Sequence, residues 1–509
     1  MIAFCVIIFT NQFQERRDMS NLTFGNLMLG YLDAENEVRY NRESFEDFFY
    51  DLNGTLNKLS DFKKPTSLLI GRKGVGKSAY AVRLDLLNIA SKESFIVKLG
   101  EVSYGHFVKI SDNKGNVLGT QRYLHAWYLL LLCSVVKRLD EKDVTDVKAL
   151  KVLKNAVSDL GLSSGRDIVR DIFIASKKEF KVKLSMLELS LSSDGDNTCT
   201  KFSNLTDFTN FFIDVFCSLG ITREIFPIID GVDDILRTKK DTQEILSGLV
   251  RAVYSLNQKN FSNNKVKFIL VIREDIVKMI NDPDMNKIVR DTGYKLDWYT
   301  NSNSGTDNLL MLLNKRILFK EQEYDNSNPL KIWNTLFPNV LKNQSSWNYF
   351  LEYTMYRPRD IIQFLNQFIE NYPNHNNITR EVFNDELRKF SQDYFYEEMR
   401  NELLGFLNDD TIDALFDVLQ KLGTSRRDNF DFQDILDVYS ENYPNYDIKE
   451  VKHILTTLFN TGYVGMLRKI EQGNHVKTYV NFKHKDPRLA VDFSSKFIIH
   501  KGLFSALNI

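Results

Sequence analysis

Short apolar runs alternate with stretches of helical character along the first two thirds of the chain. Runs of strand length occupy residues 67–70, 94–99, 225–229, 266–272 and, more weakly, 295–298. Stretches of helical periodicity or length occupy residues 79–90, 122–139 and 307–319. Strands that alternate with helices build parallel sheets, so this pattern predicts an α/β core around a parallel sheet.

The alternation is interrupted at about residues 140–205. A charged helical stretch comes first, then an alternating segment at 181–191, and then the polar run Ser192-Ser-Asp-Gly-Asp-Asn197. We interpret this region as an insertion in the core. A regulatory or assembly element and a solvated decoration both fit its composition, and no chemistry is assigned to it.

The C-terminal part of the chain has a different pattern. Three helix-like segments, 411–422, 432–439 and 448–460, precede strand-like runs at 463–470 and 475–482. The predicted apolar face of the third segment consists of Ile448, Val451, Leu455 and Leu458. Asp447 and Glu450 form a suitable capping pair at its start. Three helices followed by a hairpin predict a winged helix.

These patterns divide the chain into four predicted parts. They are a lead-in at 1–60, a core at 61–325, a helical lid at 326–400 and a winged-helix domain at 401–509. The opening apolar segment is far shorter than the roughly 20 residues that span a bilayer, and no basic region precedes it. We expect residues 1–18 to be an extension upstream of a start at Met19, with no stable membrane anchor. A short membrane-associating tail is the alternative.

Charge and cysteine content narrow the range of partners. The 509 residues include 66 basic and 67 acidic side chains, a formal net charge of −1, so no global positive field favours nucleic acid. The four cysteines form no Cys-x-x-Cys pair and no ligand spacing with the seven histidines. Neither a disulfide framework nor a zinc site is therefore predicted, and a reducing cytoplasm is the expected setting.

The strand at 67–70 runs directly into Gly71-Arg-Lys-Gly-Val-Gly-Lys-Ser78 and then into a helix. The glycines permit turns that β-carbons obstruct, so successive N–H groups converge on an anionic phosphate at the helix N-terminus. Lys77 is expected to reach the β- and γ-phosphates of ATP, and Ser78 to offer its hydroxyl to Mg²⁺. The predicted nucleotide-binding residues are Gly71, Arg72, Lys73, Gly74, Val75, Gly76, Lys77, Ser78 and Ala79.

Carboxylates follow the strand at 225–229, in the sequence Asp230-Gly-Val-Asp-Asp234. Beside a P-loop, such a strand end predicts that Asp230 holds Mg²⁺ through water. Asp233 or Asp234 is then expected to orient the attacking water or accept its proton, and the sequence leaves open which of them does so. A structural acidic turn is the alternative.

Arg273 follows the strand at 266–272 and is a candidate sensor of the γ-phosphate. The expectation requires this strand to lie between the P-loop strand and the strand that ends at Asp230. An ion pair between Arg273 and Glu274 or Asp275 is the alternative.

Two more arginines, Arg357 and Arg359, stand at the start of an amphipathic helix in the predicted lid. Pro358 and Asp360 suit a helix start. Either arginine is a candidate for contact with the nucleotide from the lid. Pairing with local carboxylates is the alternative for both.

The predicted wing is rich in basic residues. Between residues 468 and 488 the basic residues are Arg468, Lys469, Lys477, Lys483, Lys485 and Arg488, against Glu471 and Asp486. This bias suits the phosphates of DNA, but the predicted recognition helix at 448–460 is only mildly basic. Winged helices also serve as protein contacts and as braces, so both readings stay open.

Together these motifs resemble the additional-strand P-loop ATPases of the AAA+/STAND type over about residues 60–380. With the P-loop sequence, Phe24-Gly-Asn and Asp33-Ala-Glu look like a group of bacterial P-loop ATPases often encoded in mobile or phage-defence loci. The resemblance implies a P-loop NTPase core with an additional central strand, a helical lid and an appended winged helix. AAA+ proteins usually have an adjacent Asp-Glu pair where this chain has Asp230-Gly-Val-Asp-Asp234, a departure that leans toward STAND proteins.

The resemblance also implies a function. The leading hypothesis is a Mg²⁺-dependent ATPase that acts as a molecular switch or motor in anti-phage defence, self-associates and controls a partner effector or nucleic acid. An arginine finger would come from a neighbouring subunit. The alternative is a nucleotide-gated DNA-binding regulator with slow hydrolysis. A small-molecule kinase is a third reading, against which the lid arginines and the winged helix argue.

Overall fold

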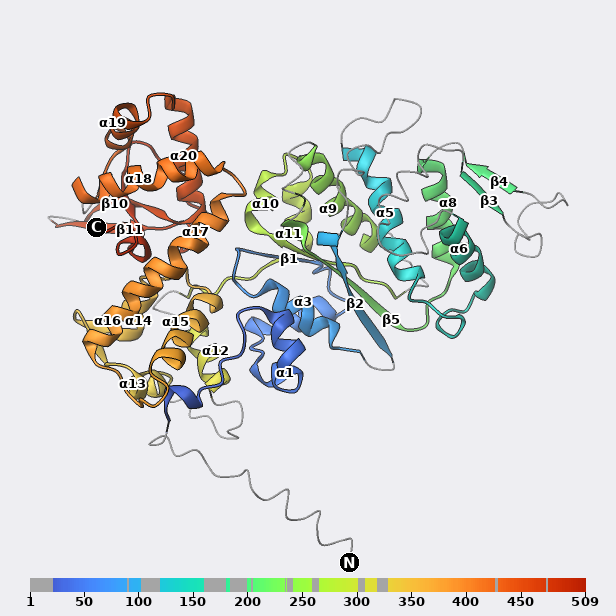
Figure 1. Cartoon of the computed structure of the whole chain (residues 1–509). Coiled ribbons are helices and arrows are strands. Elements are labelled where there is room, and N and C mark those ends of the chain that lie inside the picture. The colour runs from blue at the N-terminus through green and yellow to red at the C-terminus, as the bar shows by residue number, and fades with distance from the viewer. Residues whose placement is uncertain are drawn as a thin grey trace, which may run out of the picture. The chain divides into compact units, whose positions relative to one another are not determined.

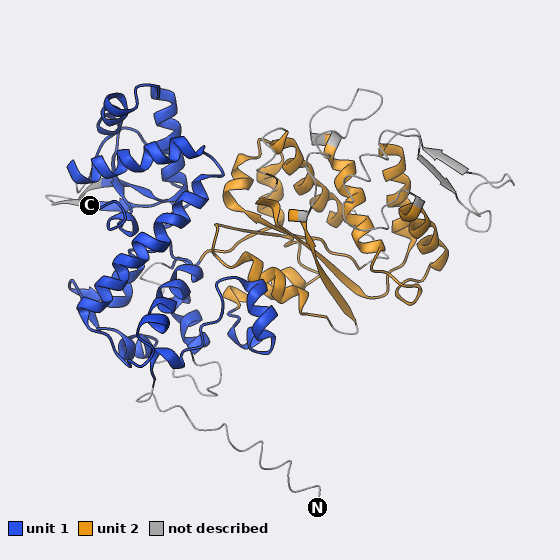
Figure 2. Cartoon of the chain, in the orientation of Figure 1, with its two compact units in different colours: residues 1–50, 298–509 blue, residues 51–297 orange. Residues whose placement is uncertain are grey.

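The computed structural model divides into two compact units (Figures 1 and 2). Residues 51–297 form one unit, here called the P-loop unit, and residues 1–50 with 298–509 form the other, the helical unit. The residues that the structure describes are 22–88, 91–101, 120–159, 180–183, 199–202, 205–233, 235, 241–258, 265–300, 307–317, 328–425, 429–472 and 475–509. None of the helices within these ranges is both long and apolar enough to cross a membrane.

The P-loop unit is built on a five-stranded parallel sheet with the order β2-β5-β6-β1-β7. Its strands are β1 (Leu68–Gly71), β2 (Lys92–Lys98), β5 (Glu224–Asp230), β6 (Ile269–Arg273) and β7 (Gly293–Lys295). The strand β6 lies between β1 and β5, which confirms the predicted additional central strand. The carboxyl ends of β1, β5 and β6 therefore meet at one edge of the sheet, the usual place for ligands in such sheets.

Helices cover both faces of this sheet, with α3 on one side and α5 and α9 on the other (Figure 1). The helices of the unit are α2 (Thr55–Ser60), α3 (Lys77–Asp85), α5 (Thr120–Val136), α6 (Val147–Asp159), α8 (Leu205–Ser218), α9 (Thr242–Gln258), α10 (Glu274–Met279) and α11 (Met285–Thr292). From Ala126 to Val136 the α5 helix is apolar apart from Ser134, which suits its burial in the core. Its Trp127 is fully buried and donates its indole N–H to the Ile245 carbonyl oxygen on α9 at 2.9 Å.

The described part of the predicted insertion contains α6 and a hairpin of β3 (Phe180–Lys183) and β4 (Cys199–Phe202). On α6, Leu150, Leu153 and Ala156 are buried and belong to the same hydrophobic core as α5 and α8. The first helix of this region is thus part of the core rather than a solvated decoration. The polar run at 192–197 lies outside the described residues.

The helical unit begins with a lead-in that is fastened to later helices. Phe24 is fully buried, its ring stacks on Phe368 with centroids 5.2 Å apart, and its N–H donates to the His375 carbonyl oxygen at 3.0 Å. Further along, Glu37 of α1 (Ala34–Phe48) forms a buried ion pair with Arg316 of α12 (Asn308–Ile317) at 3.1 Å. The lead-in from residue 22 to residue 50 is therefore an integral part of this unit, whereas residues 51–60 belong to the P-loop unit.

The predicted lid is helical, with an aromatic core. Its elements are α13 (Lys331–Leu336), the short strands β8 (Val340–Leu341) and β9 (Gln344–Ser345), α14 (Ser346–Leu351), α15 (Pro358–Asn371), α16 (Arg380–Lys389), a π-helix (Phe390–Phe395) and α17 (Tyr396–Leu403). Phe350 and Phe364 stack at 4.2 Å, and Trp333 packs beside them. Pro358 stands in the first turn of α15, as predicted.

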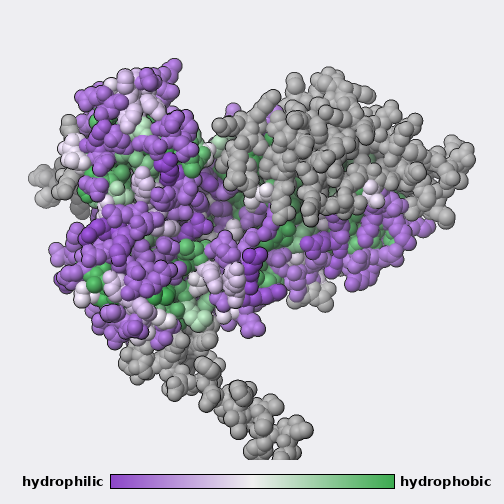
Figure 3. Space-filling model, in the orientation of Figure 1, coloured by the Kyte–Doolittle hydropathy of each residue, from purple (hydrophilic) through white to green (hydrophobic). Residues whose placement is uncertain are grey.

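The C-terminal module shows the predicted order of three helices and a hairpin. It consists of α18 (Asp409–Ser425), α19 (Phe432–Asn442), α20 (Ile448–Thr461), β10 (Val464–Gln472), β11 (His475–Asn481) and β12 (Lys496–Ile499). The strand β12 was not predicted, and it extends the hairpin to the antiparallel order β11-β10-β12. The side of the helical unit that faces the viewer in Figure 3 is mainly hydrophilic, with small apolar spots.

Several predictions differ from the structure. The core predicted at 61–325 ends at residue 297, and α12, predicted as part of the core, belongs to the helical unit. The helix after the P-loop was predicted at 79–90. It begins earlier, at Lys77, because Gly76 is its N-cap, and it ends at Asp85. The fifth strand lies at residues 293–295 rather than 295–298, since it pairs with residues 68–70 of β1. Ile448 is 49% exposed although it was assigned to the apolar face of α20, because the first residue of that helix extends past the packed core.

Candidate functional site

The P-loop forms the turn between β1 and α3. Gly74 and Gly76 have φ angles of 79° and 90°, which residues with a β-carbon adopt rarely. A β-carbon added to Gly76 would meet no atom within 4 Å, so the backbone conformation and not crowding requires glycine here. Gly76 also offers no capping side chain to α3. The first N–H groups of this helix, which have no acceptor within it, are therefore suited to an anionic ligand.

The remaining loop residues differ in their exposure. Val75 is buried and packs across Gly71, where an added β-carbon would lie 2.7 Å from Val75 Cγ2. Its side chain therefore shapes the loop from inside and leaves only its backbone for a ligand. Arg72, Lys73 and Ala79 are half-buried.

Lys77 lies in the first turn of α3, and its side chain folds back across the loop. Its Nζ donates a hydrogen bond to the Arg72 carbonyl oxygen at 3.0 Å. Burial lowers the pKa of Lys77 below its ordinary value, while the carboxylates of Asp233, Asp230 and Asp275 act in the opposite direction. A phosphate at this place would give the partly desolvated ammonium a stronger counter-charge than a carbonyl oxygen does.

Asp230 and Ser78 are brought together from β5 and α3. The Ser78 hydroxyl hydrogen-bonds to the Asp230 carboxylate, whose Oδ1 also accepts the N–H of Gly231 at 2.8 Å. Burial raises the pKa of Asp230, and these two hydrogen bonds with the charge of Lys77 oppose the rise. The adjacent hydroxyl and carboxylate are oxygen donors of the kind that Mg²⁺ prefers, so the residues fit this ion.

The described residues contain no group of three or more His, Cys, Asp and Glu side chains arranged to hold a metal ion. A magnesium ion at Ser78 and Asp230 would thus take its other ligands from water and nucleotide phosphates, as is usual for this ion.

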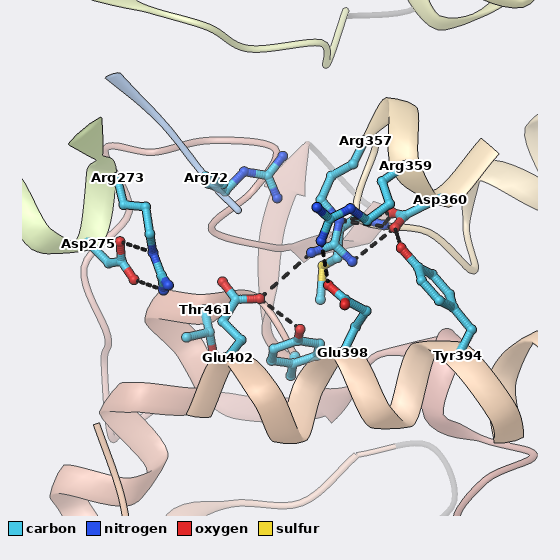
Figure 4. A network of polar contacts seen from close by, with 12 residues as sticks. Arg72, Arg273, Asp275, Arg357, Arg359, Asp360, Tyr394, Glu398, Glu402 and Thr461 are labelled. Carbon is cyan, nitrogen blue, oxygen red and sulfur yellow. Dashed lines mark hydrogen bonds and ion pairs between the residues drawn. The ribbon is translucent and has the colours of Figure 1, made fainter. Parts of the chain in front are cut away.

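Arg273 ends β6 directly beside the start of the P-loop, in register with Gly71. Its side chain is 8% exposed. The Nε donates to Asp275 Oδ1 at 3.0 Å, and Nη2 contacts Asp275 Oδ2 (Figure 4). The third nitrogen, Nη1, lies 3.4 Å from Asp233 Oδ2. The predicted position of Arg273 is confirmed by the sheet order, and the ion pair with Asp275 that was the alternative reading is present as well.

Of the two candidate water-orienting carboxylates, the structure describes one. Asp233 follows β5, and its side chain is 53% exposed at the same edge of the sheet as Arg273. Asp234 lies outside the described residues. Lys77, Ser78, Asp230, Asp233 and Arg273 therefore converge from three separate segments of the P-loop unit.

The two lid arginines have different surroundings (Figure 4). Arg357 is 1% exposed, its Nε lies 3.0 Å from Asp360 Oδ1, and its Nη1 lies 3.7 Å from Glu402 Oε2. Its guanidinium thus has one local carboxylate partner, Asp360, as in the alternative reading, and a distant one, Glu402. Arg359 is 29% exposed and pairs with Glu398 of α17 at 3.5 Å. Arg359 keeps the larger solvent-accessible surface of the two.

The Arg357 network joins the lid to the C-terminal module. Tyr463, which follows α20, donates to Glu402 Oε2 at 2.8 Å. Tyr394 of the π-helix donates to Asp360 Oδ1 at 3.0 Å. Although burial lowers the pKa of Arg357, the Asp360 carboxylate holds it well above its ordinary value. Charged groups enclosed in this way link α15, α17 and the segment after α20 through hydrogen bonds.

A model of the FunZ-associated C-terminal helical domain family matches residues 307–397. The match begins at α12, contains Arg357 and Arg359, and ends at the start of α17. It covers less than a fifth of the chain, so it describes this helical segment and not the whole protein.

The chain is also similar to the transposon gamma-delta 80.3 kDa protein of Escherichia coli (strain K12). The two are 21% identical over 318 residues, which is 59% of this chain and 41% of the relative. The chain therefore spans about two fifths of the length of the curated relative that it matches.

Among solved structures, similarity extends to three archaeal proteins. The first is a Walker-type ATPase of Pyrococcus abyssi, with 13% identity and a TM-score of 0.39 over 91% of this chain and 96% of that one. The second is the Aeropyrum pernix ORC1 protein in complex with DNA, with 12% identity and a TM-score of 0.37 over 96% of each chain. The third is the Aeropyrum pernix ORC2 protein in ADPNP and ADP complexes, with 12% identity and a TM-score of 0.39 over 92% of this chain and 93% of that one. These values are too low to support an argument about this chain, which rests on its own residues.

Several basic residues of the predicted wing have partners within the chain. Lys483 donates to the Leu489 carbonyl oxygen, Arg488 pairs with Asp486 at 3.0 Å, and Lys485 is half-buried with its ammonium 5.1 Å from the ring centre of Tyr356. Arg468 is exposed, and the side chains of Lys469 and Lys477 lie outside the described residues. The basic bias of the sequence thus overstates the charge that is free to meet phosphates.

Two features of the site were not predicted as such. Asp275 was considered only as an alternative partner that would argue against a role for Arg273, whereas it binds the arginine at the site itself. Tyr80, two residues after Ser78, is 2% exposed, and its hydroxyl accepts the Leu52 N–H at 2.7 Å and lies 3.2 Å from Asp51 Oδ1. Tyr80 therefore fixes the segment before the P-loop against α3. Its place three residues after Lys77, one helical turn into α3, was the available signal.

Proposed function

We propose that this chain binds ATP with Mg²⁺ and hydrolyses it. The observation that carries this proposal is the meeting of Lys77, the Ser78 and Asp230 pair, and Arg273 at one edge of the sheet. These groups come from α3, β5 and β6, and together they supply the charges and donors that phosphoryl transfer requires. An accidental glycine-rich turn would not explain why a hydroxyl, a carboxylate and two cations gather beside it.

Each residue has a role in this proposal. The P-loop N–H groups and Lys77 hold the phosphates, and Ser78 and Asp230 hold the ion. Bound Mg²⁺ neutralises charge on the phosphate oxygens. Asp233 orients the attacking water and accepts its proton, and Arg273 stabilises charge on the γ-phosphate oxygens. Catalysis thus consists mainly of positioning and electrostatic stabilisation.

The output of the ATPase, in our proposal, passes through the lid to the C-terminal module. The support is the buried network of Arg357, Asp360, Glu402 and Tyr463, which joins the lid to this module. A movement of the lid that separated these residues would leave a buried charge without its partner, so the lid and the module are expected to move together. The module then acts on a protein effector or a further copy of the chain. The resemblance described above suggests bacterial anti-phage defence as the setting.

DNA is the alternative target of the C-terminal module. The observation in its favour is the exposed side of α20, which presents Lys449, Lys452 and His453. Against it stand the internal partners of Lys483, Lys485 and Arg488. Binding to DNA through phosphates would weaken steeply with salt, which separates it from a protein contact made by apolar residues such as the exposed Tyr479 and Val480.

The test is phosphate release from ATP by the purified chain, with and without Mg²⁺ and DNA. We expect turnover to be abolished in Lys77→Ala and Asp230→Ala and unchanged in Lys148→Ala, an exposed lysine of the same unit. Stimulation by DNA that salt removes would favour the DNA-gated regulator. Loss of ATP binding in Lys77→Ala but not in Lys148→Ala would locate the site, whereas absence of ATP binding to the unmodified chain would refute the proposal.

A further inference from the structure

Asp275 binds the edge of the Arg273 guanidinium that faces away from the water-orienting carboxylate. Its two oxygens contact Nε and Nη2, and only Nη1 is directed to Asp233. A two-point contact of this kind fixes the plane of the guanidinium as well as its position. The direction of the third nitrogen is therefore set by Asp275.

Asp275 is itself held in place by its position in the chain. It lies in the first turn of α10, of which Arg273 is the N-cap, and its Oδ1 accepts the N–H of Ile276 at 3.0 Å. Arg273 in turn is fixed by β6, where it pairs with Gly71. Both residues of the ion pair are thus attached to regular elements of the fold. The Arg273 side chain is 8% exposed and the Asp275 side chain 26% exposed.

We propose that Asp275 is a positioning residue that aims Arg273 at the γ-phosphate and keeps it from closing on Asp233. This inference rests on the proposed ATPase function and adds a residue to it. Because Asp275 holds the Nε and Nη2 edge of the guanidinium, Nη1 is directed to the site, where it lies 3.4 Å from Asp233 and can transfer to a phosphate oxygen. Without Asp275, the same guanidinium is free to form a two-point contact with Asp233 and to withdraw this carboxylate from the attacking water.

The proposal and simple electrostatics predict opposite effects of removing the charge. Asp275 is one of the carboxylates that act on Lys77, so its loss makes the phosphate site more positive. On charge alone, Asp275→Asn would bind ATP and ADP more tightly. If Asp275 positions Arg273, the variant instead loses preference for ATP over ADP and loses turnover, because only the γ-phosphate and the transition state use Nη1.

The neighbouring Glu274 provides a matched control. It lies in the same helical turn and pairs with Lys278 at 2.7 Å and with Lys295 at 3.0 Å, away from Arg273. Glu274→Gln removes one carboxylate from this turn and leaves the Arg273 contacts intact. We expect its turnover and its ATP preference to equal those of the unmodified chain.

The experiment measures kcat and KM for ATP, and the affinities for ADP and for a non-hydrolysable ATP analogue, in Asp275→Asn, Glu274→Gln, Arg273→Ala and the double variant Arg273→Ala with Asp275→Asn. We expect kcat of Asp275→Asn to fall about 10- to 100-fold, as for one misplaced charge-assisted hydrogen bond, with ADP affinity retained. In the Arg273→Ala background, the second change should have almost no further effect, since Asp275 acts through Arg273.

The outcomes separate the two proposals. If Lys77→Ala abolishes turnover but Asp275→Asn behaves like Glu274→Gln, the role of Asp275 is refuted and the ATPase remains. If Asp275→Asn lowers turnover equally with and without Arg273, Asp275 acts on its own and the positioning role is also refuted. If the unmodified chain neither turns over ATP nor distinguishes its analogue from ADP, both proposals fail together.

Discussion

Two aspartate and arginine pairs in the helical unit have the same spacing and different surroundings. Arg357 and Asp360 are three residues apart with side chains 2% and 0% exposed, whereas Asp385 and Arg388, also three apart, are 55% and 59% exposed. Water screens the second pair and replaces either partner when it is lost. The first pair has no such replacement, so its energetic weight depends on burial and not on spacing.

We predict that Asp360→Asn destabilises the helical unit by about 3–5 kcal/mol, because it leaves the Arg357 charge buried without its main counter-charge. Asp385→Asn should change stability by less than about 1 kcal/mol, as is usual for exposed pairs. Chemical denaturation followed by circular dichroism compares the two variants. Equal effects would mean that the interior of the network is hydrated.

A second residue-scale prediction concerns His500, which is 2% exposed. Its Nδ1 accepts the Gly502 N–H at 3.0 Å, and its ring stacks on Phe395 with centroids 5.1 Å apart. Burial lowers the pKa of His500 from 6.5 to about 3, and the positive charges of Lys485, Arg357 and Lys501 act in the same direction. The neutral imidazole is therefore the form that fits the folded chain.

Because the unfolded chain takes up a proton on this histidine at a higher pH than the folded chain does, stability falls as pH decreases from about 6.5 toward 3. One group contributes a slope of at most about 1.4 kcal/mol per pH unit. Unfolding measured at several values between pH 7.5 and pH 5 should show a shallower pH dependence in His500→Gln than in the unmodified chain. An unchanged slope would assign the acid sensitivity to other groups.

Among the helices, two N-termini show how local sequence separates a start with a side-chain cap from a start without one. The N-cap of α20, Asp447, accepts the N–H groups of Lys449 and Glu450 at 2.7 and 2.8 Å, and Glu450 returns a contact to the Asp447 N–H. The N-cap of α3 is Gly76, which has no side chain to offer. The first helix satisfies its own donors, and the second leaves them for a ligand.

We therefore expect Asp447→Ala to destabilise the C-terminal module by about 1 kcal/mol, the usual loss for an N-cap. Lys449→Ala, in the same turn but exposed and without a role as a cap, should be nearly neutral. Hydrogen exchange of the α20 amides would show the difference as faster exchange in the first turn of Asp447→Ala alone. Equal exchange in both variants would show that packing, and not the cap, holds this helix start.

At the scale of the whole molecule, the P-loop, Asp230, Asp233 and Arg273 all belong to the unit formed by residues 51–297. A ligand that binds only the folded form stabilises it by about 2.7 kcal/mol at one hundred times its Kd. We expect ADP with Mg²⁺ to slow hydrogen exchange in this unit. Protection that extends to the start of α15 would show that Arg359 or Arg357 responds to nucleotide, and its absence would leave both arginines with structural roles.

The features that depend on neighbouring residues could be predicted from the amino-acid sequence. The P-loop, the strand end at Asp230, the start of α15 and the cap of α20 were all predictable, because backbone conformation and capping are set within a few residues. The central position of β6 was predicted too, through resemblance to a known architecture.

The burial of individual side chains and the identity of their partners could not be predicted, because both follow from the packing of distant segments. The burial of α6 depends on α5 and α8, and that of Arg357 on Glu402 and Tyr463, which lie 45 and 106 residues further along the chain. The contact between Arg273 Nη1 and Asp233 likewise joins residues that lie 40 positions apart in the sequence. Desolvation and ion pairing arise from contacts between distant segments, and no local pattern of hydrophobic and polar residues encodes such contacts.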